Sequence, residues 1–184
     1  MCGILGQIGG ELNLPLFNEA LTRLEHRGPD GEGIWSDQKE VTFGHRRLAI
    51  IDLTDGGKQP LEMGNYVLTF NGEIYNHEEL RSKLPQYNYR GHSDTETITH
   101  ALEVWGIRKT IEHLDGMFAL AIHNIVSKEL ILARDFAGIK PLFYGEQNGQ
   151  VVFGSQYDQV KAHPLFCEKI NFWISPVRSC RRCG

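Results

Sequence analysis

A cysteine occupies position 2 of the chain, and the next thiol is that of Cys167. A cysteine that serves packing normally lies inside a strand or helix, whereas the second residue of a chain is usually frayed. If Met1 is removed, Cys2 carries the free α-amine of the chain close to its own thiol. The amine can then accept the thiol proton, as the N-terminal amine does for threonine nucleophiles. This pair could attack an amide or ester carbonyl; the alternative is that the residue at position 2 is arbitrary.

The stretch "TFNGEIYN" contains the two kinds of donor that form an oxyanion hole. Asn71-Gly72, directly after the strand-like "YVLTF", could be only a type I′ hairpin turn. No partner strand follows, however, because the chain runs through Glu73 into a helix that we expect to be capped by Asn76. A side-chain amide and a glycine N–H can both donate to an oxyanion. We therefore predict such donors at Asn71 and Gly72, with the carboxylate of Glu73 at the same point.

Two further charged groups lie beside apolar runs. Arg46 and Arg47 precede the apolar part of "GHRRLAIID", so on a half-buried strand one arginine faces solvent and the other faces inward. An inward guanidinium requires a carboxylate partner from the protein or from a ligand. Asp94 opens the helix-like "SDTETITHALEVW", where its alternative role is to cap the helix or to interact with the helix dipole.

Short strands must position these groups, and the hydrophobic spacing predicts where they lie. "ILGQIGG" is typical of a strand that anchors the cysteine, and "LPLFNEALTRLEHRG" has helical spacing that ends at Gly28-Pro29. An Asn148-Gly149 hairpin turn is predicted between "PLFY" and "QVVFGS". The other predicted strands are "GIWS", "VTFGHRRLAIIDL", "YVLTFNGEIYN", "MFALAIHNIV" and "ELILARD".

Two helices are predicted between these groups of strands. "NHEELRSKL" begins after Asn76 as N-cap with Glu79 at the third helical position, and "SDTETITHALEVWG" has a capping box of Ser93 and Glu96. We expect Gly106 to end the second helix. The order of strands, two helices and strands again, with hairpin-length connections, favours an α+β layered fold with antiparallel sheets.

The composition excludes several classes of function. With 184 residues the chain suits one domain, and a net charge of −4 gives no field that would recruit nucleic acid or an anionic membrane. Four cysteines are too few for a disulfide framework, no secretory signal is visible, and the longest apolar runs are much shorter than a membrane-spanning helix. We therefore expect a reduced, cytoplasmic protein with no nucleic-acid and no membrane partner.

The chain resembles the class II glutamine amidotransferase domain of the N-terminal nucleophile family, in the form found in glutamine-hydrolysing asparagine synthetases. "NGEIYN" with "RLAIIDL" and "GIKPLFY" favours this type over the aminosugar-forming or purine-forming relatives. An ordered set of motifs is far more specific than one short motif. The matching stretches follow the family's order over about residues 1–166: "MCGI", "HRGPDG", "GHRRLAIIDL", "QPL", "NGEIYNHEELR", "SDTE", "LDGMFALAI", "RDFAGIKPLFY" and "KAHP".

The resemblance implies a four-layer αββα sandwich of two antiparallel sheets flanked by helices. It implies that Cys2 attacks the side-chain amide of L-glutamine while Asn71 and Gly72 stabilise the oxyanion. The products would be a glutamyl thioester, then glutamate and ammonia. By the same resemblance, the α-carboxylate is held by Arg47, the α-ammonium faces Glu73 and Asp94, and the loop beside the cysteine is supported by Arg27.

The charges of these residues also fit free glutamine on physical grounds. Glutamine carries one carboxylate and one ammonium, so a pocket for it should offer an arginine and one or two acids. Because buried charges must be paired, a substrate that lacks either charge would leave protein groups unpaired and be rejected.

The chain departs from the resemblance at Gln156, where a glutamate is expected, and after residue 166. Asparagine synthetase-like enzymes continue into a domain that uses ATP and Mg and has a Ser-Gly-Gly-x-Asp-Ser loop, which these residues lack. We expect residues 1–166 to form the glutaminase domain and residues 167–184 an irregular tail, in a truncated or frame-shifted chain or an isolated domain. No cofactor is expected in this chain, and ammonia would pass to a synthetase domain or subunit if one is present.

Several alternatives stay open at this point. The chain could be a non-catalytic domain that binds glutamine or a synthetase partner, or an inactive fragment. It could also hydrolyse another amide, although the charges that match a zwitterion argue against this. We expect no metal; the alternative is a structural zinc site formed by His163, Cys167, Cys180 and Cys183.

Overall fold

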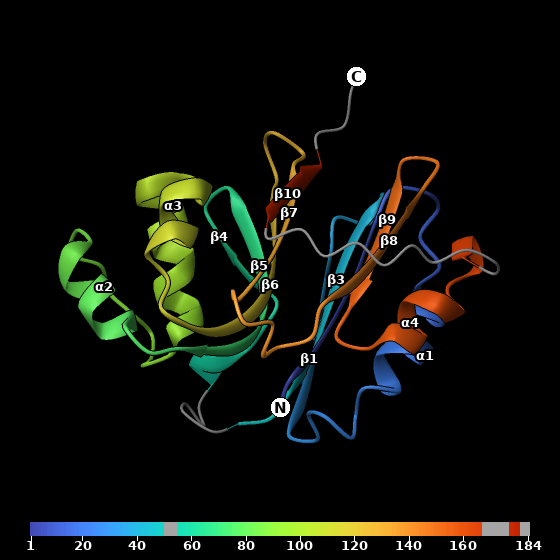
Figure 1. Cartoon of the computed structure of the whole chain (residues 1–184), viewed down its shortest axis with the longest axis horizontal. Helices are drawn as coiled ribbons and strands as arrows, with labels where there is room; N and C mark the ends of the chain where they lie inside the picture. The colour runs from blue at the N-terminus through green and yellow to red at the C-terminus, as the bar shows by residue number, and fades with distance from the viewer. Residues whose placement is uncertain (50–54, 167–176, 181–184) are drawn as a thin grey trace.

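Two five-stranded antiparallel sheets face each other in the computed structural model (Figure 1), which describes residues 1–49, 55–166 and 177–180. The first sheet, in the order β2-β3-β1-β9-β8, contains β1 (Gly3–Ile8), β2 (Gly31–Ser36), β3 (Val41–Arg47), β8 (Phe143–Gln147) and β9 (Gln150–Gly154). The second sheet, in the order β10-β7-β6-β5-β4, contains β4 (Leu61–Met63), β5 (Tyr66–Ile74), β6 (Gly116–Asn124), β7 (Leu130–Arg134) and β10 (Val177–Cys180).

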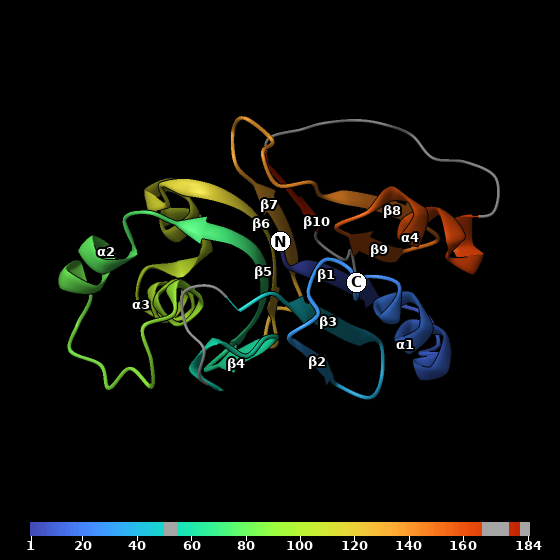
Figure 2. The same ribbon diagram turned by 90° about the horizontal axis from the view of Figure 1, so that it is seen from below.

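Helices cover the outer face of each sheet (Figure 2). The helices α1 (Leu14–Thr22) and α4 (Tyr157–Ala162) pack on the first sheet, and α3 (Asp94–His113) packs on the second sheet with α2 (His77–Lys83) beside it. This arrangement confirms the four-layer αββα sandwich. Within the described ranges, no helix has the length and apolar character that crossing a bilayer requires.

The strand β6 separates the layers by alternating large and small side chains. Phe118, Leu120 and Ile122 pack toward α3 with Leu68 and Ile98, among other apolar side chains. Ala119 and Ala121 instead lie in the layer between the sheets, where the partners include Ile4, Phe43 and Phe153. Successive side chains of a strand point to opposite faces. The small alanines therefore lie where two sheets must meet, and the large residues lie where the sheet meets a helix.

The start of α3 differs from the predicted capping box in the contacts of both side chains. Ser93 is the N-cap, as predicted, and its hydroxyl accepts the Thr95 N–H at 3.1 Å. The Glu96 carboxylate accepts the N–H groups of Arg90 and Gly91, at 2.8 and 3.2 Å. Glu96 therefore fixes the loop that leads into the helix, because that loop folds back over the first turn.

The predicted N-cap position of Asn76 is confirmed, but its side chain bonds elsewhere. Asn76 is the N-cap of α2, but its side chain makes no capping hydrogen bond. Its amide donates to the His113 carbonyl at 2.9 Å and accepts the Asp115 N–H at 3.1 Å. Asn76 thus ties the start of α2 to the end of α3, and a single side chain cannot make both sets of bonds.

The helix α3 continues past Gly106, where we expected it to end. Gly106 has φ of 76° and ψ of 169°, so the element is two helical segments joined at a kink. These angles belong to a region that is essentially restricted to glycine. Gly106 therefore ends the first segment, as its position predicted, but the chain turns directly into a second one.

The tail contains a strand that its lack of periodicity did not predict. Val177–Cys180 pairs antiparallel with β7 and forms an edge of the second sheet. Cys167 and Cys183, which belong to the alternative zinc site, lie outside the described residues.

The backbone conformation at the kink predicts that a side chain at residue 106 lowers the free energy of unfolding. A Cβ built on Gly106 meets nothing within 4 Å, so Gly106→Ala introduces backbone strain without a steric clash. We expect the free energy of unfolding to fall by about 1–3 kcal/mol in urea titrations. An unchanged stability would show that the two segments can join as one regular helix.

Candidate active site

A cavity of about 130 Å³ opens where the N-terminal end of β1 meets β5 and the start of α3. Side chains from both sheets line it, so the sandwich itself forms the walls. The predicted catalytic and substrate-binding residues all line this one cavity: Cys2, Arg47, Asn71, Gly72, Glu73 and Asp94.

Strand register places Cys2 beside Arg47. In the antiparallel pairing of β1 with β3, Gly3 lies opposite Arg46, so the preceding Cys2 lies next to Arg47. The Cys2 Sγ accepts the Leu48 N–H at 3.4 Å and donates to the Leu48 carbonyl at 3.7 Å. Arg27 lies outside the cavity lining, but its Nε donates to the Cys2 carbonyl at 3.1 Å. Arg27 therefore holds the backbone of the cysteine.

Asn71 and Gly72 lie inside β5 and form no hairpin turn; the chain then runs into α2, as predicted. They lie opposite Ala119 and Phe118 of β6. A Cβ on Gly72 would lie 2.2 Å from the Met117 carbonyl oxygen, so only glycine fits this close approach of two strands. The strand geometry, and not a turn, therefore fixes the direction of these donors.

Side chains occupy the edge of β5 that β4 leaves open. The Phe70 N–H donates to Gln59 Oε1 at 2.6 Å, and the Ile74 N–H donates to Asp94 Oδ2 at 3.0 Å. Along a strand, alternate residues direct their N–H groups to the same edge. The Gly72 N–H therefore faces this edge between two occupied positions, at the cavity wall.

The side-chain amide of Asn71 is a second donor at this wall. Its Nδ2 is buried and has no hydrogen-bond partner in the part of the chain that the structure describes. A buried donor without a partner is costly, by about 1–3 kcal/mol. The cavity thus offers two directed donors, one from a backbone and one from a side chain.

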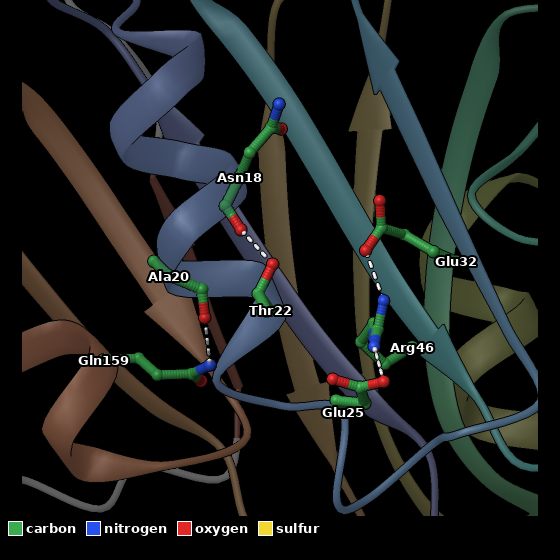
Figure 3. A network of polar contacts seen from close by, with 7 residues as sticks. All are labelled: Asn18, Ala20, Thr22, Glu25, Glu32, Arg46 and Gln159. Atoms are coloured by element: carbon green, nitrogen blue, oxygen red, sulfur yellow. Dashed lines mark hydrogen bonds and ion pairs between the residues drawn. The ribbon is translucent and has the colours of Figure 1, made fainter.

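The two neighbouring arginines separate as strand alternation requires, but Arg46 does not simply face solvent. Its side chain is only 11% exposed and forms ion pairs with Glu25, at 3.5 Å, and with Glu32 (Figure 3). These two carboxylates pair with the terminal nitrogens of the guanidinium, while its buried Nε has no partner among the described residues. Arg47 is the arginine that lines the cavity.

The cavity carries charges of both signs. Glu73 and Asp94 contribute carboxylates, and Arg47 and Lys140 contribute cations. Burial raises the pKa of Asp94, the N–H groups of Ile74 and Thr95 oppose this, and the negative charge of Glu73 adds to it. Because Ser93 is the N-cap, Asp94 is not needed to cap α3, and its carboxylate faces β5 and the cavity.

Among the lining residues that were not predicted as site residues are three with large polar or charged side chains: His45, Gln59 and Lys140. His45 could have been found, because it lies two residues before Arg47 and thus on the same face of β3. Gln59 and Lys140 come from loops, where no periodicity indicates the direction of a side chain. Gln156, which stands where a glutamate was expected, lies outside this lining and its side-chain amide contacts His26 at 2.8 Å.

Removing the charge of two buried aspartates should have opposite effects on the free energy of unfolding. Asp94→Asn keeps an oxygen that can accept the Ile74 N–H, so we expect its free energy of unfolding at neutral pH to equal or exceed that of the wild type. The raised pKa means that ionised Asp94 costs stability as the pH rises above its ordinary range. The advantage of the variant should therefore disappear at acid pH, where the wild type holds the proton. Urea titrations across this pH range measure the difference.

Asp135→Asn is the matched control. Burial alone would raise the pKa of Asp135, but four backbone N–H groups lower it, those of Lys140, Ile139, Phe118 and Gly138. The charge of Asp135 therefore stabilises the fold, and its removal should cost about 1–3 kcal/mol at neutral pH. A loss of stability in both variants would contradict the assignment for Asp94.

Comparisons with known proteins agree with this geometry. A family model described as a glutamine amidotransferase domain matches residues 1–173. Asparagine synthetase [glutamine-hydrolyzing] 3 of Bacillus subtilis (strain 168) is 37% identical over 177 residues, covering 89% of this chain and 28% of that protein. Asparagine synthetase [glutamine-hydrolyzing] 2 of Oryza sativa subsp. japonica is 42% identical over 176 residues, covering 92% of this chain and 29% of that protein. The chain thus spans less than a third of these relatives.

Among solved structures, glutamine phosphoribosylpyrophosphate amidotransferase from B. subtilis matches with a TM-score of 0.76 and 22% identity, over 98% of this chain and 49% of that one. A structure described as the allosteric regulatory enzyme of purine biosynthesis matches with a TM-score of 0.72 and 24% identity, over 86% and 43%. At these identities the likeness concerns the fold alone. The family model covers most of the chain, and on that match the chain belongs to the glutamine amidotransferase domain family.

Proposed function

We propose that this chain is the glutaminase part of an asparagine synthetase-like enzyme and hydrolyses L-glutamine to glutamate and ammonia. One observation carries the proposal. A thiol, two directed donors, an arginine and two carboxylates line one cavity, which is the set that a zwitterionic amide requires. The printed names of the relatives support glutamine as the nitrogen source.

The first half of the reaction forms a thioester. After removal of Met1, the α-amine of Cys2 takes the thiol proton and the sulfur attacks the carboxamide carbon. Asn71 Nδ2 and the Gly72 N–H donate to the oxyanion. The tetrahedral intermediate collapses as the amine returns a proton to the nitrogen, so the C–N bond breaks and ammonia leaves. In the second half, water attacks the thioester, the C–S bond breaks and glutamate leaves with the thiol restored.

The charged residues select the substrate. Arg47 binds the α-carboxylate, and Glu73 and Asp94 bind the α-ammonium. Arg27 supports this geometry through the Cys2 carbonyl. A substrate with both charges offers an opposite charge to Arg47 and to the two carboxylates, whereas an uncharged amide offers none.

Ammonia would then be used by a synthetase domain or subunit that makes asparagine. This part of the proposal rests on the printed names of the relatives. Those proteins are longer than this chain. ATP and Mg belong to that synthetase reaction, and no step in the cavity described above needs a cofactor. The four cysteines are too few and too clustered for a disulfide framework and fit a reducing compartment, so we propose a cytoplasmic location.

The nucleophile is tested by the mass and the activity of the purified chain. We expect the intact mass to lack Met1 and glutamine to yield glutamate and ammonia in equal amounts. Cys2→Ala should reduce this release to background while calorimetry still detects glutamine, because the charged groups remain. Retained Met1 with glutamine binding and no turnover would favour a non-catalytic glutamine-binding domain. Release that survives Cys2→Ala would refute the mechanism.

The ammonium site is tested with glutaramic acid, which is glutamine without the α-amino group. We expect kcat/KM for glutaramic acid to be lower than for glutamine by about 10³-fold or more, since it leaves buried carboxylates unpaired. Asp94→Asn should lower kcat/KM for glutamine by about 10²-fold. The same variant should barely affect glutaramic acid, and an equal loss with both substrates would place Asp94 outside the ammonium site.

A further inference from the structure

His45 combines complete burial with an unused hydrogen-bonding atom. His45 is among the residues that line the Cys2 cavity, although it is only 1% exposed. Within the described part of the chain, its Nε2 is buried and has no hydrogen-bond partner. The Phe70 carbonyl lies where it opposes the fall of the ring's pKa. Because Nε2 is the ring nitrogen without a partner, we assign the N–H to Nδ1 and the lone pair to Nε2. His45 is therefore an acceptor at the cavity.

Burial keeps this ring neutral. Desolvation, together with the positive charge of Arg47, lowers the pKa of His45 to about 3, against the opposing effect of the Phe70 backbone. The other titratable and charged side chains that line the cavity are Cys2, Arg47, Glu73, Asp94 and Lys140. Near neutral pH, Nε2 thus stays an acceptor and cannot donate.

Asn71 provides the complementary atom in the same cavity. Its Nδ2 is a buried donor without a partner, and it does not bond to His45 Nε2. A ligand that satisfies both atoms must present an acceptor to one and a donor to the other. A primary carboxamide has an oxygen and an NH₂ group on one carbon and does both. A carboxylate has only acceptors, and an ester has no donor.

We propose that His45 determines specificity for the carboxamide, because its Nε2 accepts a hydrogen bond from the NH₂ group of glutamine. This inference rests on the proposed function and names the part of the substrate that His45 recognises. The carboxamide oxygen then faces Asn71 and Gly72, and the leaving nitrogen faces His45. Glutamate, the product, would place an oxygen lone pair against the lone pair of Nε2. The site therefore binds glutamine in preference to glutamate and releases its product.

His123 offers a matched control. It is also 1% exposed, it lies near Trp35 and Phe43 with ring centroids 6.2 and 6.4 Å away, and both ring nitrogens lack partners among the described residues. Its side chain does not contribute to the lining of the Cys2 cavity. His45→Phe and His123→Phe thus make the same change in two buried histidines, only one of which meets the substrate.

The test compares L-glutamine with the γ-methyl ester of L-glutamate, which has the same carbonyl and both α-charges but no N–H at the leaving group. We expect His45→Phe to lower kcat/KM for glutamine by about 5- to 50-fold, the cost of one unmet hydrogen bond. In the same variant, kcat/KM for the ester should stay within about twofold of the wild-type value or rise. His45→Gln, whose side-chain oxygen can accept, should recover part of the loss. His123→Phe should leave unchanged the ratio of kcat/KM for glutamine to kcat/KM for the ester.

An equal loss with both substrates in His45→Phe, or the same change of ratio in His123→Phe, would overturn the assignment. If His45→Phe does not fold, calorimetry of the Cys2→Ala protein decides. We expect L-glutamate to bind at least about 10-fold more weakly than L-glutamine, and equal binding would overturn the proposal. If the wild type binds glutamine but does not hydrolyse it, the proposed catalysis is refuted. If the wild type is active and His45→Phe lowers kcat/KM equally for glutamine and the ester, only the role of His45 is refuted.

Discussion

The antiparallel pairing of β1 with β3 decides where the thiol lies. It sets Gly3 opposite Arg46, and therefore Cys2 beside Arg47, at the end of a strand that is paired on both sides. A shift of one residue in this register would turn every side chain of β1 to the opposite face. Ile4 packs between the sheets and Leu5 packs against α1, so the register is held by two separate apolar clusters. The position of a terminal residue thus depends on the packing of the whole first sheet.

The other half of the cavity depends on an interrupted strand edge. β4 pairs with β5 only from Tyr66 to Leu68, and beyond this point side chains replace the missing strand. Gln59 takes one N–H and Asp94 takes another, which leaves the N–H of Gly72 between them. Gln59 also donates to Thr95 at 3.1 Å, next to Asp94. The donor that we assign to the oxyanion and the carboxylate that we assign to the ammonium are therefore held by one short network.

Much of this arrangement could be predicted from the sequence. The order of strands and helices predicted a layered α+β fold with antiparallel sheets. The family resemblance implied its four layers and the residues that would share a cavity. Side-chain partners over long distances were less predictable. Asn76 has the sequence of a cap but bonds across to His113 and Asp115, since tertiary contacts offered it both a donor and an acceptor. Asn71-Gly72 has the sequence of a turn but forms a strand, because β6 supplies a partner from a distant part of the chain.

The residues between the sheets set a limit on the size of the site. Ala119 lies opposite Asn71 in the pairing of β5 with β6, and Ala121 lies opposite Thr69. Both are fully buried in the layer that joins the two sheets. A bulkier side chain at either position would wedge the sheets apart and widen the gap between the sulfur and the donors of β5. The methyl groups of these two alanines thus limit the distance between the donors of β5 and the sulfur that we propose as the nucleophile.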